Sequence, residues 1–535
     1  MISAGIWQTL GTLFSGFFHW LLVLFVSRED IGLGAEGVGV LNLGSVSFGL
    51  LVVILLGIKK STAQKISSNC LNKGVALKEA KNGTFTIFLT SVIIGIGLII
   101  GSFLLPAPLT FQDRISSILF LFGLIMLIVW YRESAQGILS GIGEYNSIAK
   151  SILAFFLFQL VSGLLLVYLI KTFILPISLI LFCFLIGIII QVLFLYKYLR
   201  PHKYFNSEIF RFGNQKHQIK ENLEHGFQFA ITEIIPLNIL ASTSILLLFL
   251  FTNNYAITGA FSIVGGYALA GLLITNFTWP LITHIAEAHG KKDLEKIRFN
   301  LRLVIKLFFY ITFLILAVTI GISQGLIYVF YGPTYLMGST DIWIPFILTI
   351  TASTISSFEY IICCVLLGIG RKRPAAIYLG ILFLVTSGLI ALLLKLNLFT
   401  PSISTGLGYL MGILVMLPVA PYLLRKEINQ KIPFSVGLRS LLALLCTLSI
   451  AIIVIWPPLN LIRISNMLIL SLSVVVLGFI YLFLLIFFGS MSKNDFDLFD
   501  EQFKGTRLEK ILIFSAFFRK LAKFSPFSQY EKKTD

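Results

Sequence analysis

Apolar runs of about twenty residues recur along this chain, and each is long enough to cross a lipid bilayer as a helix. The runs are continuous, whereas the strands of a membrane barrel alternate apolar and polar residues. The predicted fold class is therefore an all-α polytopic membrane protein with about fourteen transmembrane helices. The fourteen runs cover 6–26, 38–58, 83–105, 115–139, 152–170, 173–196, 226–251, 258–282, 303–327, 342–367, 375–394, 405–424, 441–455 and 467–488.

The composition supports a membrane protein and argues against a nucleic-acid partner. Charged residues make up 12% of the 535 residues, against about 25% in soluble domains. The net charge is +17, but the cations lie in short loops between apolar runs and do not alternate with aromatic residues. The chain has no Walker A motif, nucleophile elbow or zincin motif. We therefore predict a protein that is not an enzyme and needs no cofactor.

The placement of the cations predicts the orientation in the membrane. Consecutive loops lie on alternate sides of the membrane. With the loops assigned in this way, 36 of the 41 Lys and Arg residues fall on one side, Arg132 included. By the positive-inside rule that side is cytoplasmic, which places both termini in the cytoplasm and the protein in the cell membrane. The five cations on the other side are Arg28, Arg114, Lys171, Lys395 and Arg463.

The two halves of the chain repeat each other weakly. The segment Leu139-Ser-Gly-Ile-Gly143 recurs as Leu366-Leu-Gly-Ile-Gly370, 227 residues later. A second match, between the runs that begin near Gly39 and Gly259, has an offset of about 220. Six helices return the chain to the side on which it started, so the repeats are parallel. This arrangement predicts two pseudo-symmetric lobes around a central cavity that opens to each side of the membrane in turn.

The repeat also predicts the domain boundaries. Residues 1–200 form an N-terminal six-helix lobe, 201–225 a basic cytoplasmic linker and 226–425 a C-terminal six-helix lobe. Residues 426–490 add two transmembrane helices, and 491–535 form a cytoplasmic tail that is basic and amphipathic. We expect this tail to lie on an anionic lipid leaflet, and a partner-binding helix is the alternative.

Three ionisable residues within the apolar runs are candidate functional residues, because charge is costly inside a bilayer. Arg132 and Glu359 are equivalent under the 227-residue offset. Both are predicted either to line the cavity, where Arg132 would bind a phosphate or a sugar acid, or to form an ion pair between the lobes. Glu133 is predicted to face away from Arg132, because consecutive helical residues point about 100° apart.

Glu233 is a candidate site for a coupling proton or sodium ion. Pro236 follows it within the same apolar run and permits a bend there. A hydrogen-bonded hinge residue is the alternative. His284, Glu287 and His289 are spaced closely enough to suggest a metal, but they precede a lysine-rich loop. We predict a solvated helix end there and no metal site.

Several segments resemble polysaccharide flippases of the multidrug/oligosaccharidyl-lipid/polysaccharide (MOP) exporter superfamily, over about residues 5–490. They are Ser27-Arg28 through Gly39, Pro280, Gly290-Lys-Lys-Asp293, Tyr331-Gly-Pro-Thr-Tyr335 and Leu367-Gly-Ile-Gly370. The resemblance implies two six-helix lobes and transport of a polyprenyl- or dolichyl-linked glycan to the outer leaflet. In this superfamily the flippases have fourteen helices and the multidrug exporters twelve, which favours a flippase.

The predicted function is thus flipping of a lipid-linked oligosaccharide. Arg132 would attract its pyrophosphate together with Lys59 and Lys60 at the cytoplasmic mouth, and Arg28 and Glu359 complete the candidate substrate-binding residues. An ion-coupled multidrug or metabolite exporter of the same fold is the alternative, with Glu233 and Glu359 binding cationic drugs. The third hypothesis is a membrane glycosyltransferase that uses Glu29 and Asp30 in the first outward loop.

Overall fold

A computed structural model of the chain describes residues 34–69, 72–104, 112–170, 176–202, 216–232, 239–271, 278–336, 338–428, 434–455 and 467–491, and also 495–497, 500, 519–520 and 522. Every regular element within these residues is a helix. The first predicted run, 6–26, lies outside them, as do Arg28, Glu233 and the amphipathic part of the tail at 501–518.

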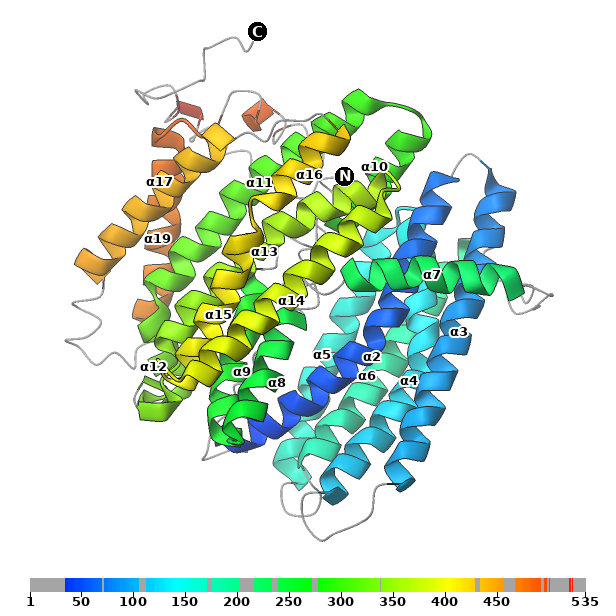
Figure 1. The fold of residues 1–535 in the computed structure, drawn as a ribbon, viewed down its shortest axis with the longest axis horizontal. Coiled ribbons are helices and arrows are strands. Elements are labelled where there is room, and N and C mark those ends of the chain that lie inside the picture. Colours follow the sequence, from blue (N-terminus) through cyan, green and yellow to red (C-terminus); the bar gives the residue numbers. More distant parts are fainter. Residues whose placement is uncertain are drawn as a thin grey trace.

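The helices follow one another closely along the chain (Figure 1). A short 3-10 turn, η1 (Arg200–His202), follows α6, and two more, η4 (Pro333–Leu336) and η5 (Gly338–Thr340), follow α12. A π-helical segment, η6 (Ala451–Ile455), extends α17. The α-helices are α2 (Gly34–Ser68), α3 (Lys73–Leu104), α4 (Gln112–Gly141), α5 (Tyr145–Ile170), α6 (Pro176–Leu199), α7 (Lys216–Thr232), α8 (Ile239–Thr252), α9 (Tyr255–Gly271), α10 (Thr278–Gly290), α11 (Leu294–Gly321), α12 (Ser323–Tyr331), α13 (Trp343–Gly368), α14 (Lys372–Leu396), α15 (Pro401–Met416), α16 (Val419–Ile428), α17 (Phe434–Ile450) and α19 (Met467–Phe487).

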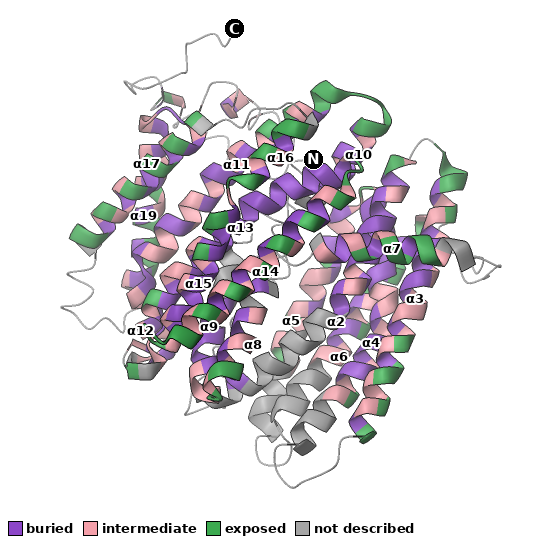
Figure 2. Ribbon diagram, viewed as in Figure 1, coloured by how far each residue is buried: buried purple, intermediate pink, exposed green. Residues whose placement is uncertain are grey.

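The described helices confirm the predicted all-α polytopic class. Ten of them are long and apolar enough to cross a membrane, and two shorter apolar helices lie at Thr243–Thr252 and Tyr255–Gly265. Most of the ten bury less than half of their apolar window, which leaves a surface for lipid. α13 differs, because 89% of its window is buried (Figure 2). It is therefore an interior helix.

Several helices continue past the apolar runs that predicted them. α2 extends ten residues beyond its run, to Ser68, and α3 begins ten residues early, at Lys73. α11 begins at Leu294, where the Asp293 carboxylate caps it by accepting from the Lys296 amide (2.9 Å). Hydropathy marks only the part of a helix that lies in the bilayer. Lys, Glu and Ala favour helix, so the polar segments at one end of the molecule continue it.

Four predicted runs are divided between two helices. The run 303–327 breaks between Gly321 and Ser323, and the run 405–424 breaks between Met416 and Val419. The second break contains Pro418, which has no amide hydrogen to continue the ladder. The runs 226–251 and 258–282 become α7 with α8 and α9 with α10, and the residues between each pair are outside the described set.

The helices form two groups that meet along α2. The N-terminal group, α2–α6, and the C-terminal group, α8–α16, lie on opposite sides of Figure 1. α17 and α19 pack against α11 at the outer edge of the C-terminal group, and α7 lies across α2 and α3 and reaches α14. α2 itself contacts α7, α8, α9 and α10, so it is the main helix of the N-terminal group at the boundary.

Glycines allow α2 to approach its neighbours closely. A Cβ on Gly39 would lie 2.5 Å from the Tyr255 carbonyl oxygen and 3.2 Å from the Gly259 amide nitrogen on α9. Gly39 and Gly259 are equivalent in the sequence repeat. Equivalent residues touch where a pseudo-two-fold axis passes between them, so this crossing marks the predicted axis.

Candidate functional site

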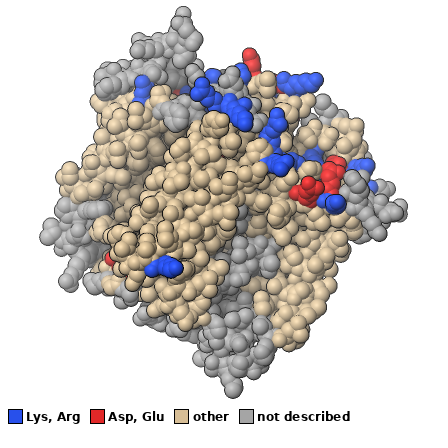
Figure 3. Space-filling model, viewed as in Figure 1, with Lys and Arg blue, Asp and Glu red and all other residues tan. Residues whose placement is uncertain are grey.

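Lys and Arg side chains gather at one end of the molecule (Figure 3). We call it the basic end, and it holds the C-terminal ends of α2, α4, α10 and α13. The candidate residues Lys59, Lys60 and Arg132 lie between two and three turns before the ends of α2 and α4. They therefore lie near the basic end of the N-terminal group.

A buried cluster of charges joins α2 to α4 inside the N-terminal group. The Lys59 ammonium lies 2.6 Å from the Glu133 carboxylate and donates to the Gln136 side-chain oxygen (3.1 Å). Arg132 also pairs with Glu133, through Nε at 2.7 Å. The side chains of Lys59 and Glu133 are 4% and 1% exposed, so water screens this cluster little.

The Arg132–Glu133 pair corrects one sequence prediction. Consecutive residues do point about 100° apart on a helix, but both side chains are long enough to bend toward each other. The Arg132 guanidinium is paired with Glu133, and Arg132 forms no ion pair with Glu359 in this conformation. The alternative of an Arg132–Glu359 pair between the lobes is therefore wrong here.

Lys60 points across the boundary instead of into its own group. Its ammonium donates to the Tyr360 hydroxyl on α13 (2.5 Å) and lies 5.3 Å from the centre of that ring. Lys59 and Lys60 are 3% and 5% exposed. Both were predicted to stand at an open mouth, and in this structure that position is closed by protein.

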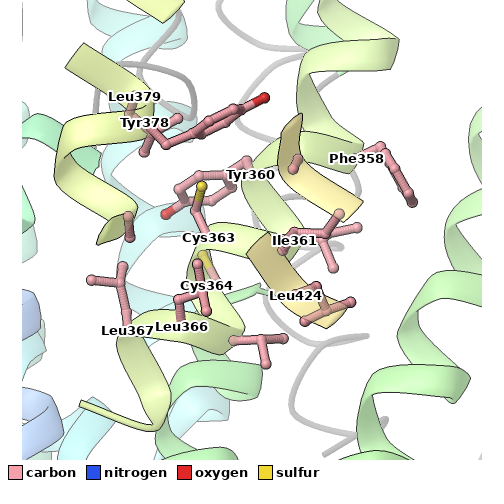
Figure 4. Close-up of a cluster of buried hydrophobic side chains, with 14 of the residues drawn as sticks. Phe358, Tyr360, Ile361, Cys363, Cys364, Leu366, Leu367, Tyr378, Leu379 and Leu424 are labelled. Atoms are coloured by element: carbon pink, nitrogen blue, oxygen red, sulfur yellow. The ribbon is translucent and has the colours of Figure 1, made fainter. Parts of the chain in front are cut away.

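Glu359 is a fully buried carboxyl on α13. Neither of its oxygens accepts a hydrogen bond of good geometry among the described residues, although the Tyr378 hydroxyl lies close enough to interact with it. The nearby Tyr378 hydroxyl on α14 donates to the Met416 carbonyl oxygen (3.3 Å). Figure 4 shows Tyr378 beside Cys363, one turn along α13 from Glu359. An ionised carboxylate without a donor is costly in such a core.

The buried polar residues that surround the candidates were not identified from the sequence. They include Gln136 on α4, Tyr360 on α13 and Tyr378 on α14. A tyrosine in an apolar run has the same sequence signal whether it faces lipid headgroups or the interior. Of these three residues, only Tyr360 has a sequence signal, because it directly follows the candidate Glu359.

A second polar cluster ties α7 to α2 and α3 at the basic end. Lys65 contacts Glu221 (3.1 Å) and Asn222 (2.8 Å) on α7 and lies 3.5 Å from Glu79 on α3. Burial lowers the pKa of His225 on α7, and the charges of Lys372 and Lys65 lower it further. The cluster fixes α7 across the boundary and leaves His225 favoured in its neutral form.

The predicted solvated helix end at α10 has ordinary surface contacts. Glu287 accepts from Lys291 (2.6 Å), and this bond lowers the pKa of the carboxyl. His284 lies 3.8 Å from the same carboxylate. Within the part of the chain that the structure describes, no group of three or more His, Cys, Asp and Glu residues could hold a metal ion.

Comparison with known proteins identifies the fold. No family model matches the sequence, and no curated protein matches it. Among solved structures, the chain resembles a MATE in complex with MaL6 (TM-score 0.66, 16% identity) and an outward-facing multidrug resistance MATE family transporter of the MOP superfamily (TM-score 0.64, 16% identity). Each match covers 80% of this chain and 95% of the other. The protein therefore has the helical fold of the MATE transporters.

Proposed function

We propose that this protein is a secondary transporter that exports an amphipathic substrate by alternating access. The carrying observation is the burial of Lys59, Glu133 and Glu359, together with the partly buried Arg132, on membrane helices next to the boundary between the two helix groups. Ionisable residues inside a membrane usually serve a transport path, because burying them is costly otherwise. The solved structures that share this fold include a multidrug resistance transporter, which supports export.

The basic end faces the cytoplasm in this proposal. The positive-inside rule supports that orientation in the cell membrane, with both termini inside. Substrate would enter at the basic end when the two groups separate there and leave at the opposite end. Transport in one direction then requires an energy source, and a cation gradient across the membrane supplies one.

Glu359 is the proposed link to that gradient. It is buried without a donor, so a bound proton, sodium ion or cationic substrate would remove the cost of its charge. It lies one residue before Tyr360, which contacts α2 across the boundary. A cation on Glu359 can therefore bias how the two groups meet. Glu233 remains a second candidate and lies outside the described residues.

The lipid-linked oligosaccharide flippase predicted from the sequence is the second candidate function. The MATE comparisons support the exporter alternative better. One observation favours the flippase: Lys59 and Arg132 share the single carboxylate of Glu133, which leaves the cluster with a net positive charge. Such a cluster would attract the pyrophosphate of a lipid-linked sugar and would repel a cationic drug.

Purified protein in sealed liposomes distinguishes these functions. A fluorescent polyprenyl-pyrophosphate oligosaccharide reports flipping, and a cationic dye reports export. We expect Glu359→Gln to slow the transported probe about tenfold or more, because it removes a buried charge from the cation site. Glu295→Gln makes the same change at an exposed position and should leave the rate unchanged. Equal rates in both variants would remove Glu359 from the mechanism.

Arg132→Ala separates the two substrate classes. If the substrate carries a pyrophosphate, losing this cation should slow flipping about tenfold. If the substrate is a cation, the same variant should keep or increase dye export. Lys197→Ala removes a cation from the last turn of α6 and serves as the control in both assays.

A further inference from the structure

Two contacts join α2 of the N-terminal group to α13 of the C-terminal group at the basic end. Lys60 donates to the Tyr360 hydroxyl (2.5 Å), and one turn later the Gln64 amide donates to the Leu367 carbonyl oxygen (2.7 Å). Leu367 lies at the end of α13, where the carbonyl groups have no amide partner within the helix and can accept a hydrogen bond from a side chain. All four residues are at most 7% exposed.

Two further contacts join the groups through α10. The hydroxyl groups of Tyr145 on α5 and Thr283 on α10 share a hydrogen bond (2.5 Å). Ser67, near the end of α2, donates to the Thr283 carbonyl oxygen (3.4 Å). Tyr145 lies just after the turn that ends α4. Both contacts therefore join α10 of the C-terminal group to helix ends of the N-terminal group.

The sequence repeat relates these contacts to one another. A Cβ on Gly141 would lie 2.8 Å from Ile66 and 3.1 Å from the Ala63 carbonyl oxygen. A Cβ on Gly368, 227 residues later, would lie 2.8 Å from Ile285 and 3.2 Å from the Ile282 carbonyl oxygen. The same packing therefore recurs in both groups. It makes the end of α2 equivalent to the end of α10, with an offset of 219 residues between equivalent positions.

Under that offset Gln64 corresponds to Thr283. Gln64 crosses the boundary to the end of α13, and Thr283 crosses it to Tyr145, just after the end of α4. Each helix end thus packs on a glycine of its own group and sends one polar side chain into the other group. Two groups that separate about a pseudo-two-fold axis would break both crossings together.

We propose that Lys60–Tyr360, Gln64–Leu367, Ser67–Thr283 and Tyr145–Thr283 form a latch that holds the basic end closed. The proposal rests on the proposed transport cycle, in which the two groups separate at this end. Three of the four contacts are hydrogen bonds between neutral groups, which break and re-form at low cost. Opening the latch would expose Lys60 and Gln64 to the cytoplasmic solution.

Cys363 and Cys364 provide native reporters for the latch. Both are buried on α13 (Figure 4), three and four residues after Tyr360 and four and three before Leu367. They therefore flank the helix face that carries these two latch residues. Opening of the boundary should expose both cysteines.

The test measures labelling of these cysteines by a membrane-impermeant maleimide, with mass spectrometry of the α13 peptide. The reagent is added to the cytoplasmic face of inside-out vesicles. We expect the rate at Cys364 to rise about fivefold in Gln64→Leu or Tyr360→Phe and about 25-fold in the double variant, since each change removes one hydrogen bond. The rate at Cys363 should rise with it, because the two cysteines flank the same helix face.

Tyr481→Phe is the matched control, because it removes a buried tyrosine bond to the Phe309 carbonyl oxygen (3.3 Å) away from the boundary. It should leave the rate at Cys364 unchanged. An unchanged rate in the double variant overturns the latch, and so does an equal rise in Tyr481→Phe, which would show that the C-terminal group has loosened as a whole. Labelling needs no substrate, so a latch that opens without any detected transport would reject the proposed function and keep the latch.

Discussion

Gly57→Leu should cause the largest loss of stability among single substitutions at the helix crossings. A Cβ on Gly57 of α2 would fall against the Gly226 carbonyl oxygen and lie 2.5 Å from the Ala230 amide nitrogen on α7. These neighbours are backbone atoms, so no side chain can rotate away. We expect a loss of about 3 kcal/mol or more, at the upper end for overpacked sites.

Thermal unfolding in detergent, followed by intrinsic fluorescence, measures this loss. Gly97→Leu is the matched control, because nothing lies within 4 Å of the corresponding Cβ on the exposed face of α3. The control should unfold at the wild-type temperature. If Gly57→Leu also does so, α2 and α7 do not cross as closely as described here.

Glu133→Ala should have the second large effect, because it leaves the buried Lys59 and the partly buried Arg132 without their shared carboxylate. Removing one partner of a buried ion pair typically costs 3–5 kcal/mol, which corresponds to a fall of about 10 °C in the unfolding temperature of a large domain. Glu79→Ala changes a carboxylate that is 22% exposed and should lower that temperature by about 2 °C at most.

A double variant tests whether the loss comes from the uncompensated charge. In Lys59→Met with Glu133→Gln, the buried ammonium and its partner are removed together, and Arg132 retains a hydrogen-bond acceptor. We expect the double variant to recover about half of the stability that Glu133→Ala loses. A double variant less stable than Glu133→Ala would show that these charges stabilise the fold by themselves.

Much of the fold could be predicted from the sequence because apolar runs and loop charges report directly on the bilayer. Helix ends are less predictable: the polar extension of α2 to Ser68 has no apolar signal, and the apolar run 405–424 continues through the break at Pro418. The repeat is visible in the sequence as two short matches, one of them at Gly141 and Gly368. Its meaning, the packing of helix ends on glycines, needed the three-dimensional contacts.

The candidate site was only partly predictable for a different reason. A charged residue in an apolar run is conspicuous, so Arg132 and Glu359 could be found, but its partner depends on side-chain length and conformation. Arg132 bends back to Glu133, its neighbour in the chain, whereas Lys60 reaches a residue 300 positions away. Long-range partners such as Tyr360 have no local sequence signal.

Transport by the purified protein is the direct test of alternating-access export. Sealed liposomes with a proton or sodium gradient would carry either the lipid-linked oligosaccharide probe or the cationic dye. We expect one probe to cross faster than in protein-free liposomes, with the gradient increasing the rate and Glu359→Gln abolishing that increase. If both probes cross at the protein-free rate under every gradient, the protein is not the alternating-access transporter proposed here.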